Sequence, residues 1–228
     1  MESRLSMRAN GHRMTHLTAM ARDLLVYALC AVAFPLVLAL RHGWSPRANL
    51  LCIMWLVHFV RRCYEVAFVH QRKAKLSDVA VVEEVVSGTL YYSGFAVWNA
   101  WAVCNLSGDL TSSSLILFVA FLVAEFGNWY HHGILASLKR DAAGNYALPR
   151  GGLFEFVAGA HYLCEILSWV IFSISAGTVA AYLFTLVGIM AMSSFSKDKH
   201  AYYLKTFDGK NGRPLYPASR TRLIPFLW

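Results

Sequence analysis

The chain has 228 residues, of which 57% are hydrophobic and only 15% are charged, and its formal net charge is +8. A chain of this length with so few charges is too apolar for an ordinary soluble domain, and the composition predicts an integral membrane protein. The basic residues alternate with long apolar runs instead of gathering on one polar module, which argues against nucleic acid as a partner.

Six apolar runs are each about 20 residues long, enough to span the ~30 Å hydrocarbon core of a bilayer. We expect helices near 24–41, 48–69, 86–106, 113–136, 154–174 and 176–195. The predicted fold is therefore all-α, a polytopic bundle of about six transmembrane helices. The expected parts are a cytosolic N-terminal segment (1–23), a transmembrane bundle (24–195) containing a cytosolic loop (137–153), and a cytosolic C-terminal tail (196–228).

The positive charges indicate the orientation, because Lys and Arg concentrate in cytosolic loops. With six helices, all of the 21 Lys and Arg residues except Arg41 and Arg47 fall on one side. Both termini are therefore expected in the cytosol. A basic cytosolic face would also favour anionic lipid headgroups or a phosphorylated cofactor. The cations on this side are Arg4, Arg8, Arg13, Arg22, Arg61, Arg62, Arg72, Lys73, Lys75, Lys139, Arg140, Arg150 and those from Lys197 onward.

The run 48–69 carries charged residues inside a predicted membrane helix. Each such residue costs about 2.5–3.5 kcal/mol at the helix centre, so those that persist usually face the bundle interior and take part in function. In the segment HFVRRCYE, the spacing i, i+4, i+7 places His58, Arg62 and Glu65 on one face. We assign these three residues to a substrate site. An ion pair between Arg62 and Glu65 at the membrane boundary would explain the same pattern.

The runs 113–136 and 154–174 also carry polar faces. In the segment EFGNWYHHG, Glu125, Asn128 and His132 are spaced i, i+3, i+7, and further along His161 and Glu165 are i, i+4 neighbours. Hydrogen bonding between helices would explain Asn128 on structural grounds, and mutual pairing would explain His161 and Glu165. Several polar faces in one bundle favour a common cavity instead.

A metal site built from His132, His161 and Glu165 would be chemically reasonable, because imidazole and carboxylate groups suit zinc or iron. The sequence has no His-Glu-x-x-His motif and no cluster of several histidines, so we predict no metal. Tyr162 stands beside the His161–Glu165 pair, and Glu155 lies near the start of the same run.

The loop 137–153 is the expected place for a nucleotide. No G-x-G-x-x-G follows a strand-like run and no G-x-x-x-x-G-K motif is present, so a nucleotide would need a non-Rossmann site. The turn Pro149–Gly152 permits close backbone approach. A positive-inside loop with a turn is the alternative explanation. The residues that would contact phosphates and polar groups are Lys139, Arg140, Asn145, Tyr146 and Arg150.

Several separated motifs resemble the C-terminal domain of the steroid 5α-reductase family. They are LPRGGLFEFVAGAHYLCEILSW and, near the end, KDKHAYYLKTF and YPASRTRLIPFLW. Three further segments are more similar to very-long-chain trans-2-enoyl-CoA reductases: HFVRRCYEVAFVHQRK, GTLYYSGFAVWNAW and TLVGIMAMSSFSKDKHAYYLKTF. The likeness runs from about Arg47 to Trp228. It implies a multi-span endoplasmic-reticulum enzyme that uses NADPH to reduce a carbon–carbon double bond conjugated to a carbonyl.

The resemblance also implies roles for individual residues. Tyr162 occupies the tyrosine of the enoyl reductases' Asn-Tyr pair, where it is the expected proton donor, and His161 is its expected partner or the enolate donor. Glu165 is expected to orient groups near the nicotinamide. The residues expected to surround NADPH are Asn128, His132, Lys139, Arg140, Tyr146, Arg150, Gly151, Gly152, His200 and Tyr203, the last two from a tail that folds back onto the cofactor.

The sequence departs from the family pattern at three positions. His161 stands where the family usually has Asn, and Phe59 stands where it has Tyr. With Pro35 aligned to the proline of the first matched helix, Ala31 replaces a glutamate. The missing glutamate and tyrosine are implicated in engaging the carbonyl of steroid substrates, so their loss weakens a steroid assignment.

The expected function is NADPH-dependent reduction of the trans-2 double bond of long-chain or very-long-chain enoyl-CoA in fatty acid elongation, in the endoplasmic reticulum membrane. Acyl-CoA, membrane lipids and other elongation enzymes are the expected partners. A 3-oxo-5α-steroid 4-dehydrogenase or a polyprenoid reductase of the same family is one alternative. A non-catalytic membrane subunit that retains the fold is another.

Overall fold

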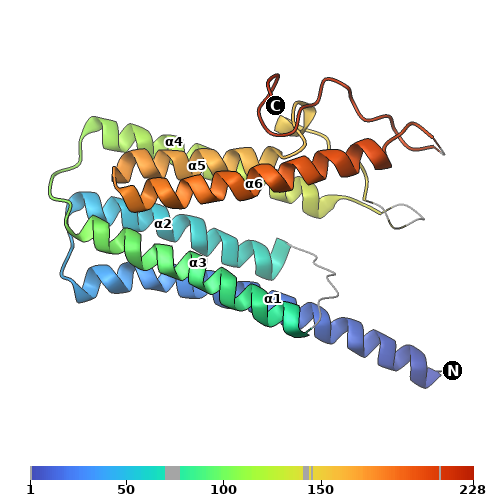
Figure 1. Cartoon of the computed structure of the whole chain (residues 1–228), viewed down its shortest axis with the longest axis horizontal. Coiled ribbons are helices and arrows are strands. Elements are labelled where there is room, and N and C mark those ends of the chain that lie inside the picture. The colour runs from blue at the N-terminus through green and yellow to red at the C-terminus, as the bar shows by residue number, and fades with distance from the viewer. Residues whose placement is uncertain (1, 70–77, 141–143, 145, 211) are drawn as a thin grey trace. The chain divides into compact units, whose positions relative to one another are not determined.

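A computed structural model describes the backbone of residues 2–69, 78–140, 144, 146–210 and 212–228, and the side chains of these residues outside 2–19 and 78–85. Arg72, Lys73, Lys75 and Asn145, together with the side chains of Arg4, Arg8 and Arg13, lie outside the described residues. Figure 1 shows the chain as a succession of long helices. They are α1 (Glu2–Leu40), α2 (Pro46–Tyr64), α3 (Asp78–Cys104), α4 (Ser112–Ser137), α5 (Ala160–Ala176) and α6 (Val179–Thr206).

Each of the six predicted apolar runs lies in a helix of the described residues, and the all-α fold class is confirmed. That all six cross a membrane, with both termini in the cytosol, stays a prediction. A π-helical segment η1 (Glu65–Val69) continues α2, and a 3-10 turn η2 (Gly152–Glu155) precedes α5. Within the described residues, three helical stretches are long and apolar enough to cross a membrane: Met20–Leu40, Ser112–Ser137 and Val179–Thr206. Helix α5 is apolar but shorter. The architecture is that of a membrane helical bundle.

Four predicted helix boundaries are wrong. Helix α3 begins at Asp78 instead of 86, because hydropathy excludes the first turns, which carry Glu83 and Glu84. Helix α1 begins at Glu2 instead of 24, because hydropathy detects a membrane span and not the polar helix before it. Helix α5 begins at Ala160 instead of 154, because Gly151 and Gly152 adopt positive φ and Gly159 precedes the first helical residue. Helix α6 continues past 195 to Thr206, since the polar segment 196–206 contains neither Gly nor Pro.

The chain divides into two compact units, Met1–Asp109 and Leu110–Trp228. In the first unit, α1 packs against both α2 and α3. The Trp55 indole N–H donates to the Cys30 carbonyl oxygen at 3.0 Å, and the Phe34 and Trp55 rings stack with centroids 5.0 Å apart. Buried aromatic rings therefore join the first two helices.

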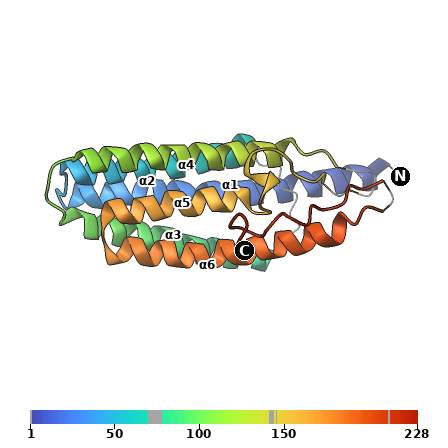
Figure 2. The ribbon, with the colours of Figure 1, turned by 90° about the horizontal axis from the view of Figure 1, so that it is seen from above.

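In the second unit, α5 lies between α4 and α6 (Figure 2). Helix α4 begins with a capping box in which Thr111 and Ser114 bond to each other's backbone N–H groups. Between α5 and α6, the buried hydroxyls of Ser173 and Thr185 lie 2.6 Å apart. They also reach the carbonyl oxygens of Ala181 and Trp169 at 2.9 and 3.0 Å. Such interhelical hydrogen bonds replace the hydrophobic force that is missing between helices in lipid.

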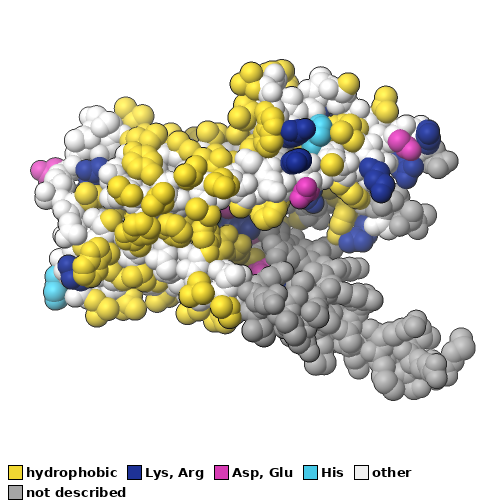
Figure 3. Space-filling view, viewed as in Figure 1, with side chains coloured by type: hydrophobic (Ala, Val, Ile, Leu, Met, Phe, Trp, Pro, Cys, Tyr) yellow, Lys and Arg dark blue, Asp and Glu magenta, His cyan; other side chains and the backbone are white. Residues whose placement is uncertain are grey.

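The outer faces of the second unit are apolar. Figure 3 shows hydrophobic side chains over its helices, and Lys and Arg side chains gathered at the end that carries the loop after α4 and the tail. Among the exposed residues are Ile116 and Val123 of α4 and Val179 and Met190 of α6. Exposed apolar side chains on this scale fit a lipid environment.

The C-terminal tail folds back onto the segment that precedes α5. Thr221 N–H donates to the Phe156 carbonyl at 2.9 Å, and Ala158 N–H donates to the Thr221 carbonyl at 2.8 Å. Gly159 N–H donates to the Arg222 carbonyl at 3.0 Å. A Cβ at Gly159 would lie 2.3 Å from the Ser196 hydroxyl, so glycine is needed where tail, α5 and α6 meet. The tail is therefore part of the second unit's core.

Candidate active site

Asn128 joins α4 to the start of α5. Its buried side-chain amide donates to the His161 carbonyl oxygen at 2.7 Å and to the Glu165 carboxylate at 3.2 Å. The His132 ring lies edge-on to the His161 ring, with centroids 5.0 Å apart. The His161 and Tyr162 rings are 3.9 Å apart. The structure thus brings together the polar residues predicted on these two helices.

The side-chain oxygen of Asn128 stands out among the buried polar atoms of α4. Among the described residues it has no hydrogen-bond partner, although buried polar atoms are normally paired. No group of three or more His, Cys, Asp or Glu residues is arranged to hold a metal ion in the part of the chain that the structure describes.

A cavity of about 370 Å³ opens beside this cluster. The predicted residues Tyr146 and Tyr162 line it, together with four residues of α6 that the sequence analysis did not single out: Phe195, Asp198, Lys199 and Tyr202. They escaped prediction because a hydropathy pattern does not show where a helix continues past the membrane. Three tyrosines and a phenylalanine give this cavity flat walls, and Asp198 and Lys199 give it both signs of charge.

The turn before α5 requires its glycines. Gly151 and Gly152 have φ of 94° and 53°, which side chains rarely adopt. A Cβ at Gly152 would lie 2.7 Å from His131 Nε2 and 2.9 Å from the Tyr130 ring. Packing against two side chains of α4 therefore requires glycine at 152, and the close approach of this backbone to a nucleotide stays a prediction.

The Glu155 carboxylate pairs with Arg150, one of the predicted loop cations. Glu155 accepts hydrogen bonds from the Gly151 backbone N–H at 2.7 Å and from Arg150 at 3.1 Å. The Gly151 N–H, followed by Arg150 and Arg220, holds the pKa of Glu155 below its ordinary value. Arg150 is thus already paired with a carboxylate in the described residues. Glu155 was expected near the start of the run 154–174, but its pairing with Arg150 was not predicted.

Arg220 of the tail is a functional candidate that sequence reasoning missed. It is only 1% exposed, and it donates to the Pro149 carbonyl oxygen at 3.1 Å. A second guanidinium nitrogen lies 3.7 Å from Glu155. Burial lowers the pKa of Arg220. The signal that could have found it is the pair Arg220 and Arg222 in a chain ending that has no acidic residue, since a buried arginine needs a partner elsewhere in the fold.

The loop after α4 presents exposed cations. The Arg140 guanidinium donates to the Tyr146 hydroxyl at 2.6 Å and lies 4.1 Å from the centre of the Tyr146 ring. Lys139 is exposed beside it. Two of the predicted phosphate contacts, Arg140 and Tyr146, are therefore neighbours in space.

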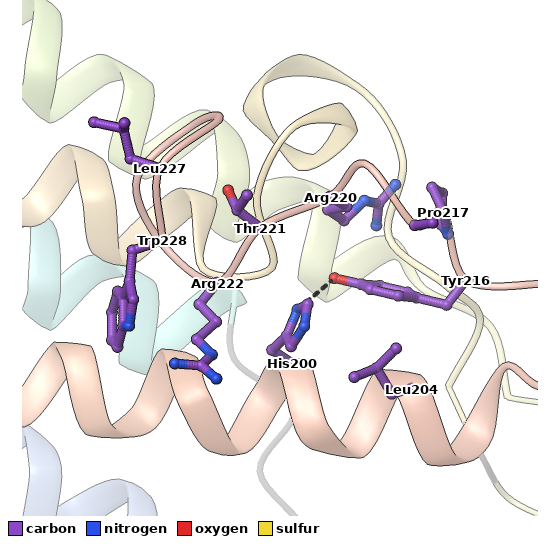
Figure 4. Close-up of a pocket in the computed structure, with 10 residues that line it drawn as sticks. His200, Leu204, Tyr216, Pro217, Arg220, Thr221, Arg222, Leu227 and Trp228 are labelled. Atoms are coloured by element: carbon purple, nitrogen blue, oxygen red, sulfur yellow. Dashed lines mark hydrogen bonds between the residues drawn. The ribbon is translucent and has the colours of Figure 1, made fainter.

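A second cavity, also of about 370 Å³, lies between α6 and the tail (Figure 4). His200 and Tyr216 face each other in it, with Nδ1 and the hydroxyl oxygen 3.1 Å apart. Burial raises the pKa of Tyr216 to about 12. Tyr203, predicted near the cofactor, is buried behind this pair, with its ring centroid 5.9 Å from that of Tyr216. Arg222 lies 5.3 Å from the Trp228 ring centroid at the other end of the cavity.

The predicted substrate residues lie together in the first unit. Glu65 is completely buried and pairs with both Arg61 and Arg62, so the ion pair considered above does form. His58 Nδ1 lies 3.4 Å from Arg61, and Arg62 lies 3.3 Å from the Tyr27 hydroxyl. The π-helical turn begins at Glu65, and such turns occur frequently at functional sites.

The chain is similar to enzymes of lipid metabolism. The profile of the family described as 3-oxo-5-alpha-steroid 4-dehydrogenase matches residues 78–228, about two thirds of the chain. Over 187 residues the chain is 30% identical to a very-long-chain enoyl-CoA reductase of Dictyostelium discoideum, covering 81% of this chain and 59% of that protein.

It is also 30% identical over 227 residues to 3-oxo-5-alpha-steroid 4-dehydrogenase 1 of Mus musculus, covering 87% of this chain and 78% of that protein. The human protein of the same name is 28% identical over 187 residues, covering 81% of this chain and 69% of that protein. The chain spans less than two thirds of the length of the very-long-chain enoyl-CoA reductases that it matches.

Proposed function

The chain belongs to the 3-oxo-5-alpha-steroid 4-dehydrogenase family, whose members are oxidoreductases, and we propose that it reduces the trans-2 double bond of long-chain enoyl-CoA with NADPH. The observation that carries this proposal is the Tyr162 phenol. It lines a cavity, and its ring lies 3.9 Å from that of His161, whose carbonyl oxygen accepts a hydrogen bond from the Asn128 amide. A phenol in that position is available as an acid.

The residues present fit a nicotinamide nucleotide. Its rings need flat walls, which Tyr146, Tyr162 and Phe195 supply. Its phosphates need cations, which the exposed loop supplies with Lys139 and Arg140. Its carboxamide needs hydrogen-bond partners, and the Asn128 oxygen is an acceptor without one among the described residues. Further candidates for holding the nucleotide are His132, Arg150, Gly151, Gly152, His200 and Tyr203.

When bound, NADPH supplies a hydride to the β-carbon of the conjugated double bond. The protein then has two tasks. A hydrogen-bond donor must stabilise the negative charge that develops on the thioester oxygen, and an acid must protonate the α-carbon. We propose that the Tyr162 hydroxyl donates the proton to the α-carbon. We propose that the His161 imidazole donates a hydrogen bond to the thioester oxygen. Glu165 accepts a hydrogen bond from Asn128. We propose that it orients the groups near the nicotinamide.

An enoyl-CoA substrate would suit both the apolar helices and the basic loop and tail of the chain. Its acyl chain is apolar and would lie among the membrane helices, while its CoA phosphates would meet the basic loop and tail. We assign His58, Arg62 and Glu65 to the substrate as well. An endoplasmic-reticulum location and association with other fatty acid elongation enzymes belong to the same proposal.

The test is the reaction itself. The full chain, purified in detergent, is given NADPH and a defined long-chain trans-2-enoyl-CoA, and the saturated acyl-CoA is measured by mass spectrometry. NADPH deuterated at C4 should transfer its label to the β-carbon. The saturated acyl-CoA in place of the enoyl-CoA should leave NADPH unchanged. Failure to consume NADPH with any enoyl-CoA or enone would leave the non-catalytic subunit as the better interpretation.

A 3-oxo-Δ4 steroid is the second candidate substrate. It is supported by the mouse and human relatives, which are named 3-oxo-5-alpha-steroid 4-dehydrogenase 1. Against it stand Ala31 and Phe59, both buried, at the positions where steroid-reducing relatives are expected to carry a glutamate and a tyrosine. The same assay with a steroid enone in place of the enoyl-CoA separates the two candidates.

A further inference from the structure

His131, beside the predicted His132, was not singled out in the sequence, yet it contacts the glycine turn directly. We propose that His131 is a positioning residue: its neutral imidazole fixes the Gly151–Gly152 turn against α4, and so holds the backbone where the cofactor is expected. The inference rests on the proposed function only in its last step, that this turn contacts NADPH.

Both ring nitrogens of His131 have partners, and these partners determine the tautomer. Nδ1 lies 2.6 Å from the Gly127 carbonyl oxygen, which can only accept, so Nδ1 carries the proton. Nε2 lies 2.9 Å from the Leu153 backbone nitrogen, whose N–H can only donate, so Nε2 is the acceptor. The side chain is 3% exposed. One neutral tautomer therefore bridges α4 and the residue that follows the two glycines.

The packing around the imidazole leaves it little freedom. The Phe154 ring lies edge-on to it, with centroids 5.3 Å apart. The Cys164 sulfur of α5 lies 3.8 Å from Nδ1. On the turn side, the absent Cβ of Gly152 would come within 2.7 Å of Nε2. The ring is enclosed by α4, α5 and the turn. It therefore fixes the position of the turn relative to the two helices.

Two hydrogen bonds hold the positive-φ residues, one at the Gly151 N–H and one at the residue after Gly152. Glu155 binds the N–H of Gly151, and His131 binds the N–H of Leu153. Left-handed backbone is uncommon and persists only when its surroundings determine it. Because Glu155 is exposed and His131 is buried, the histidine is the more rigid of the two supports.

Two substitutions of similar polarity test the contact. His131→Gln keeps an acceptor near the position of Nε2, whereas His131→Asn reaches only the position of Nδ1. Hydrogen exchange at the Leu153 amide of the full chain in detergent, without cofactor, reads the contact directly. We expect exchange roughly 2- to 13-fold faster in His131→Asn, consistent with loss of one net hydrogen bond, and closer to wild type in His131→Gln. Ser173→Ala, which removes a buried hydroxyl between α5 and α6, should leave Leu153 exchange unchanged.

The kinetic measurement separates positioning from chemistry. In His131→Asn the KM for NADPH should rise roughly 3- to 10-fold, with kcat within about 2-fold of wild type, and His131→Gln should restore most of the KM. Equal Leu153 exchange in wild type and His131→Asn would overturn the contact. A fall in kcat at unchanged KM would overturn the positioning role. A wild-type chain that binds no NADPH would instead overturn the proposed function and the cofactor step, while the exchange result would still decide whether His131 holds the turn.

Discussion

The Asn128 side chain of α4 donates one hydrogen bond to the backbone of His161 and another to the carboxylate of Glu165, at 2.7 and 3.2 Å. One amide therefore fixes two successive turns of α5 relative to α4. Asn128 is fully buried, whereas Glu165 is partly exposed.

We expect Asn128→Leu to destabilise the second unit by about 1–3 kcal/mol, because it removes the Asn128 hydrogen bonds to the His161 carbonyl oxygen and to the partly buried Glu165 carboxylate. Asn128→Asp should be worse, since it places a second carboxylate against Glu165. We will see the ranking in thermal unfolding in detergent, followed by far-UV circular dichroism: the midpoint temperature should fall in the order wild type, Asn128→Leu, Asn128→Asp. An Asp variant as stable as wild type would contradict the assigned donor.

Tyr162→Phe removes only the hydroxyl that lines the cavity. Positioned acid catalysis contributes about 10²–10⁴-fold, so turnover of enoyl-CoA should fall by a factor in that range while NADPH binding stays nearly intact. Single-turnover rates and fluorescence titration with NADPH check the two parts. Tyr182→Phe, on an exposed face of α6, is the matched control. Turnover like that of wild type would remove Tyr162 from the mechanism.

Cofactor choice should depend on the loop cations. Arg140→Gln should raise the KM for NADPH about 10- to 100-fold and the KM for NADH much less, because a hydrogen bond between charged groups is worth about 1.5–3 kcal/mol. Lys139→Gln should act in the same direction. Lys210→Gln, an exposed cation of the tail, is the control. Equal use of NADPH and NADH by the unmodified chain would contradict the assignment of a 2′-phosphate to this loop.

The contact between Glu155 and the Gly151 turn should weaken in acid. The pKa of Glu155 is held below its ordinary value of 4.5 by the Gly151 N–H and by Arg150 and Arg220. Its stabilising effect is therefore fully present above about pH 4.5 and is lost as the pH falls through the lower pKa of the folded state. Amide exchange at Gly151, corrected for intrinsic pH dependence, should accelerate in that range. Glu155→Gln should abolish the acceleration, and an unchanged profile in that variant would assign it to another group.

Much of the fold could be predicted from the sequence. Apolar runs place all six helices, because burial in lipid demands a continuous hydrophobic stretch. Asn128, His132, His161 and Glu165, which the spacing placed on polar faces, lie together between α4 and α5. The common cavity expected for the polar faces stays a prediction. The boundaries were less predictable, since α1 and α6 continue into polar sequence that hydropathy does not recognise as helix.

What the sequence did not reveal depends on contacts between distant segments. His131 differs from His132 only by one helix position, and nothing in the pattern shows that it faces the glycine turn. Arg220 lies 71 positions from its partner Pro149. Arg150 was expected to be available to phosphates, and its pairing with Glu155 follows from the turn geometry at Gly151. Such contacts appear only once the chain is folded.

The pairing of the tail with the segment before α5 also sets an order of events during biosynthesis. Thr221 binds the Phe156 carbonyl oxygen, a partner 65 positions earlier in the chain. The ribosome must therefore complete α6 and release it toward the bilayer before this backbone can be satisfied. A nascent chain whose translation stops in α6 lacks these tail residues, so the Ala158 and Gly159 N–H groups before α5 would remain without their carbonyl partners.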